Sequence, residues 1–179
     1  MVGYLLLNIA RWAGILAMLV ILFQLLSMGK GRTLEKLLSK PQLVNLHRKA
    51  IWPLLILIPL HAGLVVYGRS IEYDDSILET LRDFYLDGKL GSLTGIGILV
   101  LLFALTISIL FLQRKISFPT FKKAHLLMYV AAPALFFHQI FFGLDFVSSR
   151  LLCTAWILLC GAAATDLIIW KVRLKLIRA

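Results

Sequence analysis

The chain contains four histidines, which fall as two pairs in two separate apolar stretches: His47 with His61, and His125 with His138. The members of the first pair are 14 residues apart, and those of the second pair are 13 residues apart. A neutral imidazole can bind a metal through one ring nitrogen while a hydrogen bond holds the other, and it can also carry protons. Histidines inside apolar segments therefore predict either metal ligation or a proton path.

Both stretches begin in the same way. Pro41 precedes His47 by six residues, and Pro119 precedes His125 by six residues. A proline fits the first turn of a helix because its missing N–H would have no partner there. We therefore predict two helices whose first histidines share one depth and whose second histidines share another. At about 1.5 Å per residue, the two levels are roughly 20 Å apart.

The two spacings differ in the helix face that they present. On an ideal helix, a 14-residue spacing leaves His61 about 40° from the face of His47, so one face presents both rings. A 13-residue spacing turns His138 about 140° away from His125. The second pair can face one neighbour only if its helix bends or changes its winding, and Pro133 between the two rings is a candidate for that distortion.

Paired histidines at two depths favour haem over other metals. Two imidazoles on opposite faces of a haem leave no open iron position, and such a centre passes single electrons more readily than it binds substrate. Levels roughly 20 Å apart exclude one shared ion, and no carboxylate or thiol near the histidines completes two zinc or iron sites. We therefore predict two b-type haems. The alternative is that the histidines are packing residues or proton relays.

Haem propionates need cationic partners, and basic residues flank both levels. The candidates at the inner level are Arg48, Lys49, Lys122 and Lys123, and those at the outer level are Arg69, Arg150 and Arg11. Each of these charges also has a plainer interpretation, as an interfacial residue whose charged end reaches toward water.

The composition places these histidines in a membrane. Of the 179 residues, 60% are hydrophobic and only 16% are charged, which is far more apolar than a soluble domain of this length. The net charge of +10 does not predict a nucleic-acid partner, because the basic residues lie between long apolar runs. We expect a single all-α domain over residues 1–179 whose surroundings are membrane lipid.

Five stretches are long and apolar enough to cross a bilayer. They lie near residues 4–27, 43–68, 91–113, 120–143 and 150–170. The connection after the first is basic and the connection after the second, 69–90, is acidic. The positive-inside rule then predicts an outside N-terminus and a cytoplasmic C-terminus, in a bacterial cytoplasmic membrane. No Lys or Arg precedes Arg11, so we expect the first stretch to be a retained helix instead of a cleaved signal peptide.

The pattern H-x13-H followed two helices later by H-x12-H resembles the ferric reductase-like transmembrane domain of ferric-chelate reductases and NADPH oxidases. The run from His125 to His138 is also similar to a helix of the small bacterial haem subunit of the periplasmic methionine sulfoxide reductase system. The resemblance covers about 43–170. It implies that His47 and His125 bind the inner haem and that His61 and His138 bind the outer one.

The chain also departs from that family in several places. Family members typically have six helices, so the first would be missing here. No G-x-G-x-x-G motif is present, so we expect no flavin or nicotinamide site within the chain and electrons from a separate cytoplasmic flavoprotein or from quinol. NADPH oxidases carry a further histidine where this chain has Val65, although Arg11 resembles an arginine that they place near the outer haem.

Three functions remain open at this point. The first is a di-haem conduit that carries electrons outward to a ferric chelate, a periplasmic redox protein or oxygen. The second is a haem-bearing membrane anchor that exchanges electrons with quinone for a partner enzyme. The third is a proton-coupled carrier without haem, which predicts a colourless protein.

Overall fold

In the computed structural model of the chain, the described residues are 1–28, 34, 37–86, 102–142, 149–151, 153–162 and 165. Every regular element within these ranges is a helix. Their order is α1 (Val2–Met28), α3 (Lys40–Lys49), α4 (Ile51–Tyr73), α5 (Ile77–Leu86), α7 (Phe118–His125) and α8 (Met128–Phe142). Two further apolar helical segments are Leu102–Leu112 and Cys153–Ala162.

Two helical stretches are long and apolar enough to cross a membrane, Val2–Ser27 and Lys40–Tyr73. They correspond to the first two of the five expected spans, near 4–27 and 43–68. Parts of the last three expected spans lie outside the described residues, namely 91–101, 143, 152, 163–164 and 166–170. The acidic connection expected at 69–90 contains α5.

The second expected span is not one continuous helix, because it is interrupted at Ala50 between α3 and α4. Pro53 explains the interruption. Its ring lacks an N–H, and in a continuous helix it would clash with the carbonyl group four residues earlier, at Lys49. Lys49 is the last residue of α3.

The fourth expected span, 120–143, is also interrupted, at Leu126 and Leu127. The N–H groups of these two residues donate to carbonyls three residues back, at Lys123 (3.3 Å) and Ala124 (3.1 Å). Such bonds wind the backbone more tightly than the α-helix does. The distortion therefore lies directly after His125, and Pro133 lies inside α8.

Helices α3 and α7 start alike, as their prolines predicted. Each has a serine N-cap in extended conformation, Ser39 and Ser117, with a proline in the first turn. The Ser39 N–H donates to the Gln42 side-chain oxygen (2.9 Å), and the Ser117 hydroxyl lies 3.0 Å from that of Thr120. The bond at Ser39 supplies a partner to a backbone N–H at a helix start, where such groups lack helical partners, whereas the contact at Ser117 joins two side chains.

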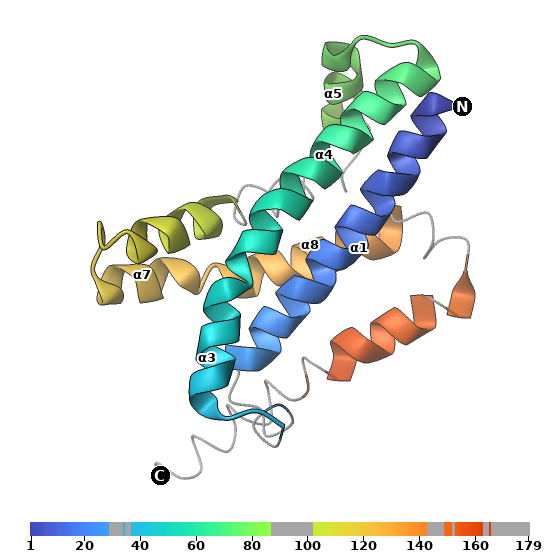
Figure 1. Cartoon of the computed structure of the whole chain (residues 1–179). Coiled ribbons are helices and arrows are strands. Elements are labelled where there is room, and N and C mark those ends of the chain that lie inside the picture. Colours follow the sequence, from blue (N-terminus) through green and yellow to red (C-terminus); the bar gives the residue numbers. More distant parts are fainter. Residues whose placement is uncertain are drawn as a thin grey trace.

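Helix α1 lies side by side with α3 and α4 and runs in the opposite direction (Figure 1). Near its start, Gly3 faces Gly68, and a methyl group added to Gly3 would lie 2.9 Å from the Gly68 carbonyl oxygen. Near its end, Ser27 meets His47. The two backbones therefore approach closely at one end through glycine, as small residues allow in packed membrane helices.

Helix α1 packs against two apolar clusters. One joins Ala17 and Ile21 to the α4 residues Ile51 and Leu54, together with the segment Leu102–Leu112. The other cluster comprises Met18, Leu22 and Trp156, with partly buried side chains of α8 around it. Helix α1 therefore lies between α4 and the segment Cys153–Ala162, which makes it a central element among the described helices.

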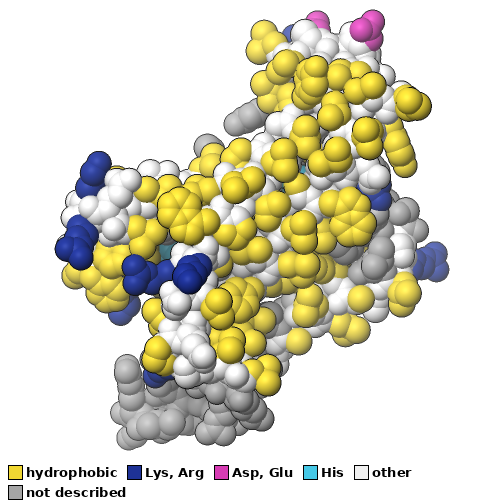
Figure 2. All heavy atoms as spheres, viewed as in Figure 1, with side chains coloured by type: hydrophobic (Ala, Val, Ile, Leu, Met, Phe, Trp, Pro, Cys, Tyr) yellow, Lys and Arg dark blue, Asp and Glu magenta, His cyan; other side chains and the backbone are white. Residues whose placement is uncertain are grey.

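Charged and apolar side chains are segregated on the surface. Figure 2 shows Lys and Arg side chains gathered around α3 and α7, Asp and Glu side chains near α5, and hydrophobic side chains over the face between them. At the start of α5, the Ser76 hydroxyl donates to the Glu79 carboxylate (2.6 Å), as does the Ser76 N–H (2.9 Å). These bonds hold the pKa of Glu79 below its usual value.

Candidate functional site

The four histidine rings meet in two pairs. The ring centres of His47 and His125 are 6.0 Å apart, with the ring planes at 82°. Those of His61 and His138 are 6.2 Å apart, at 80°. Each pair joins one ring from α3 or α4 to one ring from α7 or α8. Because the first histidines pair with each other and the second ones do too, the two helical stretches run in the same direction.

The tight turn after α7 helps both rings of the second stretch to reach their partners. His125 ends α7, and His138 lies in α8 beyond the turn at Leu126–Leu127. Two residues wound at three per turn add about 40° of rotation, which reduces the expected 140° offset to about 100°. The sequence required a distortion but did not locate this turn, because a tightened turn needs no proline.

Each histidine of the first stretch contacts a polar atom of α1 through Nδ1. The Nδ1 atom of His61 lies 2.8 Å from the carbonyl oxygen of Ala10, and that of His47 lies 3.3 Å from the Ser27 hydroxyl. Gln24 also donates from its side chain to the His47 carbonyl, at 3.5 Å. These contacts leave the Nε2 atom of each ring as the nitrogen for a metal.

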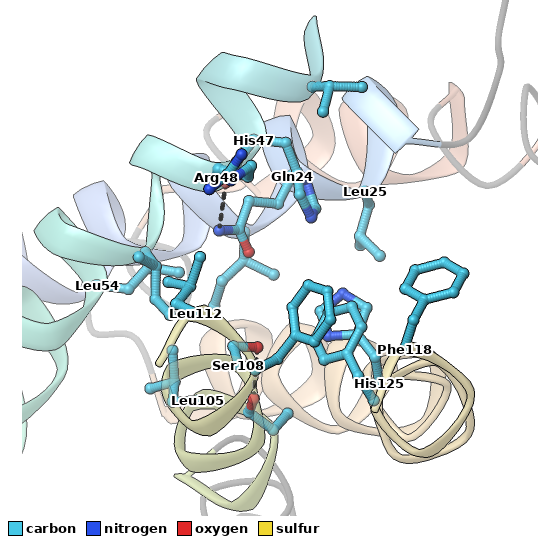
Figure 3. Close-up of a pocket in the computed structure, with 16 residues that line it drawn as sticks. Gln24, Leu25, His47, Arg48, Leu54, Leu105, Ser108, Leu112, Phe118 and His125 are labelled. Carbon is cyan, nitrogen blue, oxygen red and sulfur yellow. Dashed lines mark hydrogen bonds between the residues drawn. The ribbon is translucent and has the colours of Figure 1, made fainter. Parts of the chain in front are cut away.

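The inner pair borders a cavity of about 260 Å³. In Figure 3, His47 and His125 approach this cavity from different helices, with Gln24 and Ser108 also at its wall. The other lining residues are mostly apolar. The Nδ1 atom of His125 is buried and, among the described residues, has no hydrogen-bond partner.

An aromatic row extends from His125. Phe121 stacks on the His125 ring with ring centres 4.9 Å apart, and Phe111 stacks on Phe121 at 4.3 Å. All three rings line the cavity. Sequence reasoning missed Phe111 and Phe121, and it also missed Gln24 and Ser27. A signal for the last two exists, because they are the only uncharged polar side chains in α1 after Arg11 apart from the indole of Trp12.

The candidate propionate partners differ in their positions. All four inner candidates are exposed, but of these only Arg48 lines the cavity beside His47. At the other level, Arg69 and Arg150 are exposed and Arg11 is half-buried. Arg11 directly follows Ala10, whose carbonyl contacts His61. Arg48 is thus the inner cation that shares a cavity with a histidine pair.

The family model described as ferric reductase like transmembrane component matches residues 13–136, more than half of the chain. The chain belongs to the ferric reductase-like transmembrane family. It is therefore a membrane protein of a family associated with transmembrane electron transfer, and the match includes His47, His61 and His125. His138 lies two residues beyond the matched range. No curated protein and no solved structure matches the chain.

The paired rings of this ferric reductase-like protein fit a haem iron. Two imidazoles on opposite sides of one metal have ring centres about 6 Å apart, because each metal–nitrogen bond is about 2 Å long and the ring centre lies about 1 Å behind the nitrogen. The observed separations are 6.0 and 6.2 Å. The mostly apolar lining of the cavity next to His47 and His125 also agrees in character with an apolar macrocycle.

Proposed function

We propose that this protein carries electrons across a membrane through two b-type haems held by paired histidines. His47 and His125 hold the inner haem, and His61 and His138 hold the outer one. The observation that carries the proposal is the meeting of all four histidines in two pairs at metal-bridging separation. Packing histidines with unrelated roles would have no reason to meet twice in this way.

Each residue in the proposed site has a physical task. The four imidazoles would hold the iron, two to each haem, and a haem held by two histidines would leave no open position for a substrate. Arg48 pairs with a propionate at the inner level. When bound, each haem supplies a one-electron couple in an apolar setting. A chain of two such couples connects the faces of a bilayer, because their levels are separated by roughly 20 Å of helix.

The proposed direction of transfer is from the cytoplasmic face to the outer face. The charge pattern supports it, because basic residues gather around α3 and α7 while acidic ones lie near α5 (Figure 2). An electron that leaves a negative interior gains about 2.3 kcal/mol per 100 mV. We propose a cytoplasmic flavoprotein or quinol as donor, and a ferric chelate, a periplasmic redox protein or oxygen as acceptor.

A haem assay on purified protein tests this proposal. The wild-type chain should contain two haem b per polypeptide in a pyridine haemochrome assay. Replacement of His61 by alanine should reduce that ratio to about one, and replacement of His47 should remove the other haem. Asn45→Ala is the matched control, because Asn45 is an exposed polar residue of α3 two positions before His47. It should retain both haems.

Two results would overturn the assignment. A colourless wild-type protein would remove the haem proposal and favour the proton-coupled carrier. A ratio that stays at two in His47→Ala or His61→Ala, with each variant eluting as a single peak, would show that these rings are not ligands.

The cavity beside the inner pair supports a second candidate function, exchange of electrons with quinone. Its wall combines Phe111, Phe118 and Phe121 with two polar side chains, Gln24 and Ser108, a mixture typical of small-molecule sites. Dithionite-reduced protein that is reoxidised by a soluble quinone and ignores ferric chelates would favour the quinone-linked anchor. Reoxidation by ferric chelates alone would favour the reductase.

A further inference from the structure

Helix α1 contributes no histidine, yet it contacts both histidines of the neighbouring stretch. Its Ala10 carbonyl meets His61, and its Ser27 hydroxyl meets His47. Both contacts are made to Nδ1, the ring nitrogen on the side away from Nε2. Because α1 runs antiparallel to α3 and α4, Ala10 in its first half contacts His61, and Ser27 near its end contacts His47.

The contact with Ala10 determines which ring nitrogen of a neutral His61 carries the proton. A carbonyl oxygen can only accept a hydrogen bond, so the Nδ1 atom of a neutral His61 must carry the proton. Nε2 is then the nitrogen with a free lone pair, which is the form that a metal requires. At 2.8 Å, this bond is short enough to hold the ring firmly.

The contact with Ser27 has the same consequence for His47. Ser27 is 7% exposed, and its single hydroxyl proton is donated to the Gln24 carbonyl at 3.0 Å. The hydroxyl oxygen is therefore left to accept a bond from His47 Nδ1. The two histidines consequently share one tautomer, although the bond to His47 is longer, at 3.3 Å.

Gly14 provides the space that His61 occupies. A methyl group added at Gly14 would lie 2.8 Å from Nδ1 and 2.9 Å from Cε1 of the His61 ring. The imidazole ring is the movable end of the His61 side chain, so the added methyl group would displace this ring and leave the backbone in place. Glycine is a poorer helix former than alanine, and its position one turn after Ala10 is explained by this close approach.

We propose that α1 aligns both histidines for ligation, with Ser27 as the positioning residue of His47 and Gly14, together with the Ala10 carbonyl, as the positioning elements of His61. This inference rests on the proposed haem function. It adds that the ligand set depends on a helix that supplies no ligand, and that the outer level is held more tightly than the inner one.

Gly14→Ala tests the outer half of the proposal. It should reduce the haem ratio from two to about one, and a redox titration should lack the same component that His61→Ala lacks. Gly63→Ala is the matched control, since a methyl group there meets nothing within 4 Å. It should leave both haems and both potentials unchanged. A Gly14→Ala protein with two haems and wild-type potentials would overturn this half.

Ser27→Ala tests the inner half. The variant should release its inner haem to apomyoglobin about tenfold faster, because loss of an outer-shell hydrogen bond typically weakens metal sites 10- to 100-fold. The midpoint potential of that haem should rise, because His47 loses its acceptor and becomes a weaker donor to ferric iron. Ser27→Thr should restore both values, and Thr106→Ala, which removes an exposed hydroxyl bonded within its own helix, should change neither. Unchanged release and potential in Ser27→Ala would overturn this half.

A measurement without haem separates this inference from the proposed function. Histidine-labelled protein contains four imidazoles, and nitrogen NMR distinguishes the two neutral tautomers. His47 and His61 should both carry the proton on Nδ1, and Ser27→Ala should shift only the His47 signal. A wild-type protein without haem but with these tautomers would overturn the proposed function alone. The opposite tautomer at either ring would overturn the alignment by α1.

Discussion

At the scale of single residues, His61 and His47 each contact α1 through Nδ1, but the two contacts differ in partner and in length. His61 has a short bond from its ring to a backbone carbonyl, which cannot be removed by a side-chain substitution at Ala10. His47 depends on the hydroxyl of Ser27, and its partner His125 has a buried Nδ1 without a hydrogen-bond partner among the described residues. A buried polar atom without a partner is costly. The inner level is therefore the more sensitive one to changes in nearby side chains.

Leu54 provides a residue-scale prediction about packing. It is fully buried between α1 and the segment Leu102–Leu112 and lines the inner cavity. Because lipid is as apolar as leucine, truncation to alanine should cost chiefly the packing part of a core substitution, about 1–3 kcal/mol. Unfolding in detergent measures this cost.

Ile56→Ala is the control for Leu54→Ala, since Ile56 lies on the same helix and is 68% exposed. Its truncation should cost less than about 0.5 kcal/mol. Equal costs at the two positions would contradict the assignment of Leu54 to the core.

At the scale of elements, the interruptions in the two histidine-bearing stretches matter more than their lengths. Pro53 interrupts the first between its two histidines, at Ala50. The tight turn at Leu126–Leu127 interrupts the second, directly after its first histidine. In both stretches the first histidine therefore belongs to a short helix, α3 or α7. The second histidine belongs to a longer helix, α4 or α8. The orientation of each histidine pair can therefore be set separately.

Pro53→Ala tests this arrangement. Alanine would restore the N–H and remove the ring that prevents a continuous helix, so α3 and α4 should merge and His47 should turn relative to His61. We expect the inner haem to be lost or weakened while the outer haem is retained, as measured by haem ratio and redox titration.

The control for Pro53→Ala is Pro41→Ala, because Pro41 lies in the first turn of α3, where either residue is tolerated. It should keep both haems. A Pro53→Ala protein whose two haems keep their wild-type midpoint potentials would show that the interruption at Ala50 does not set the orientation of His47.

At the scale of the whole molecule, the distribution of charge predicts a membrane side for each end through the positive-inside rule. Basic residues lie around α3 and α7, in the last turns of both helices among other places, and acidic residues lie near α5 beyond the end of α4 (Figure 2). Exposed apolar side chains cover the helices between them, including Trp12 and Trp52, which are 62% and 64% exposed. In a membrane protein this surface is the one that faces lipid.

Reporter fusions test the proposed orientation of five spans with the N-terminus outside. Alkaline phosphatase fused after Asp75 should be active, because that site follows the second span and should face outward. Green fluorescent protein fused to the C-terminus should fluoresce, because we expect that end in the cytoplasm. An inactive phosphatase at Asp75 with an active one after Lys115 would reverse the orientation.

The sequence by itself determined the membrane class and singled out the four histidines as candidate ligands. Apolar length predicted the two long helices, since a bilayer requires about 20 apolar residues, and the family match bears out the resemblance that the histidine spacing indicated. Pro41 and Pro119 predicted the matching starts of α3 and α7, because a proline restricts only its own neighbourhood and can be interpreted locally. The roles of the histidines as haem ligands stay a prediction.

Only the tertiary structure decided how the histidine rings are oriented. The contact of Ser27 with His47 and the space at Gly14 for His61 depend on which helices are neighbours. The periodicity of one helix gives the faces of that helix alone. The physical reason is that a hydrogen bond or a close approach joins residues far apart in the chain, here 20 and 47 positions, and no local pattern encodes the partner.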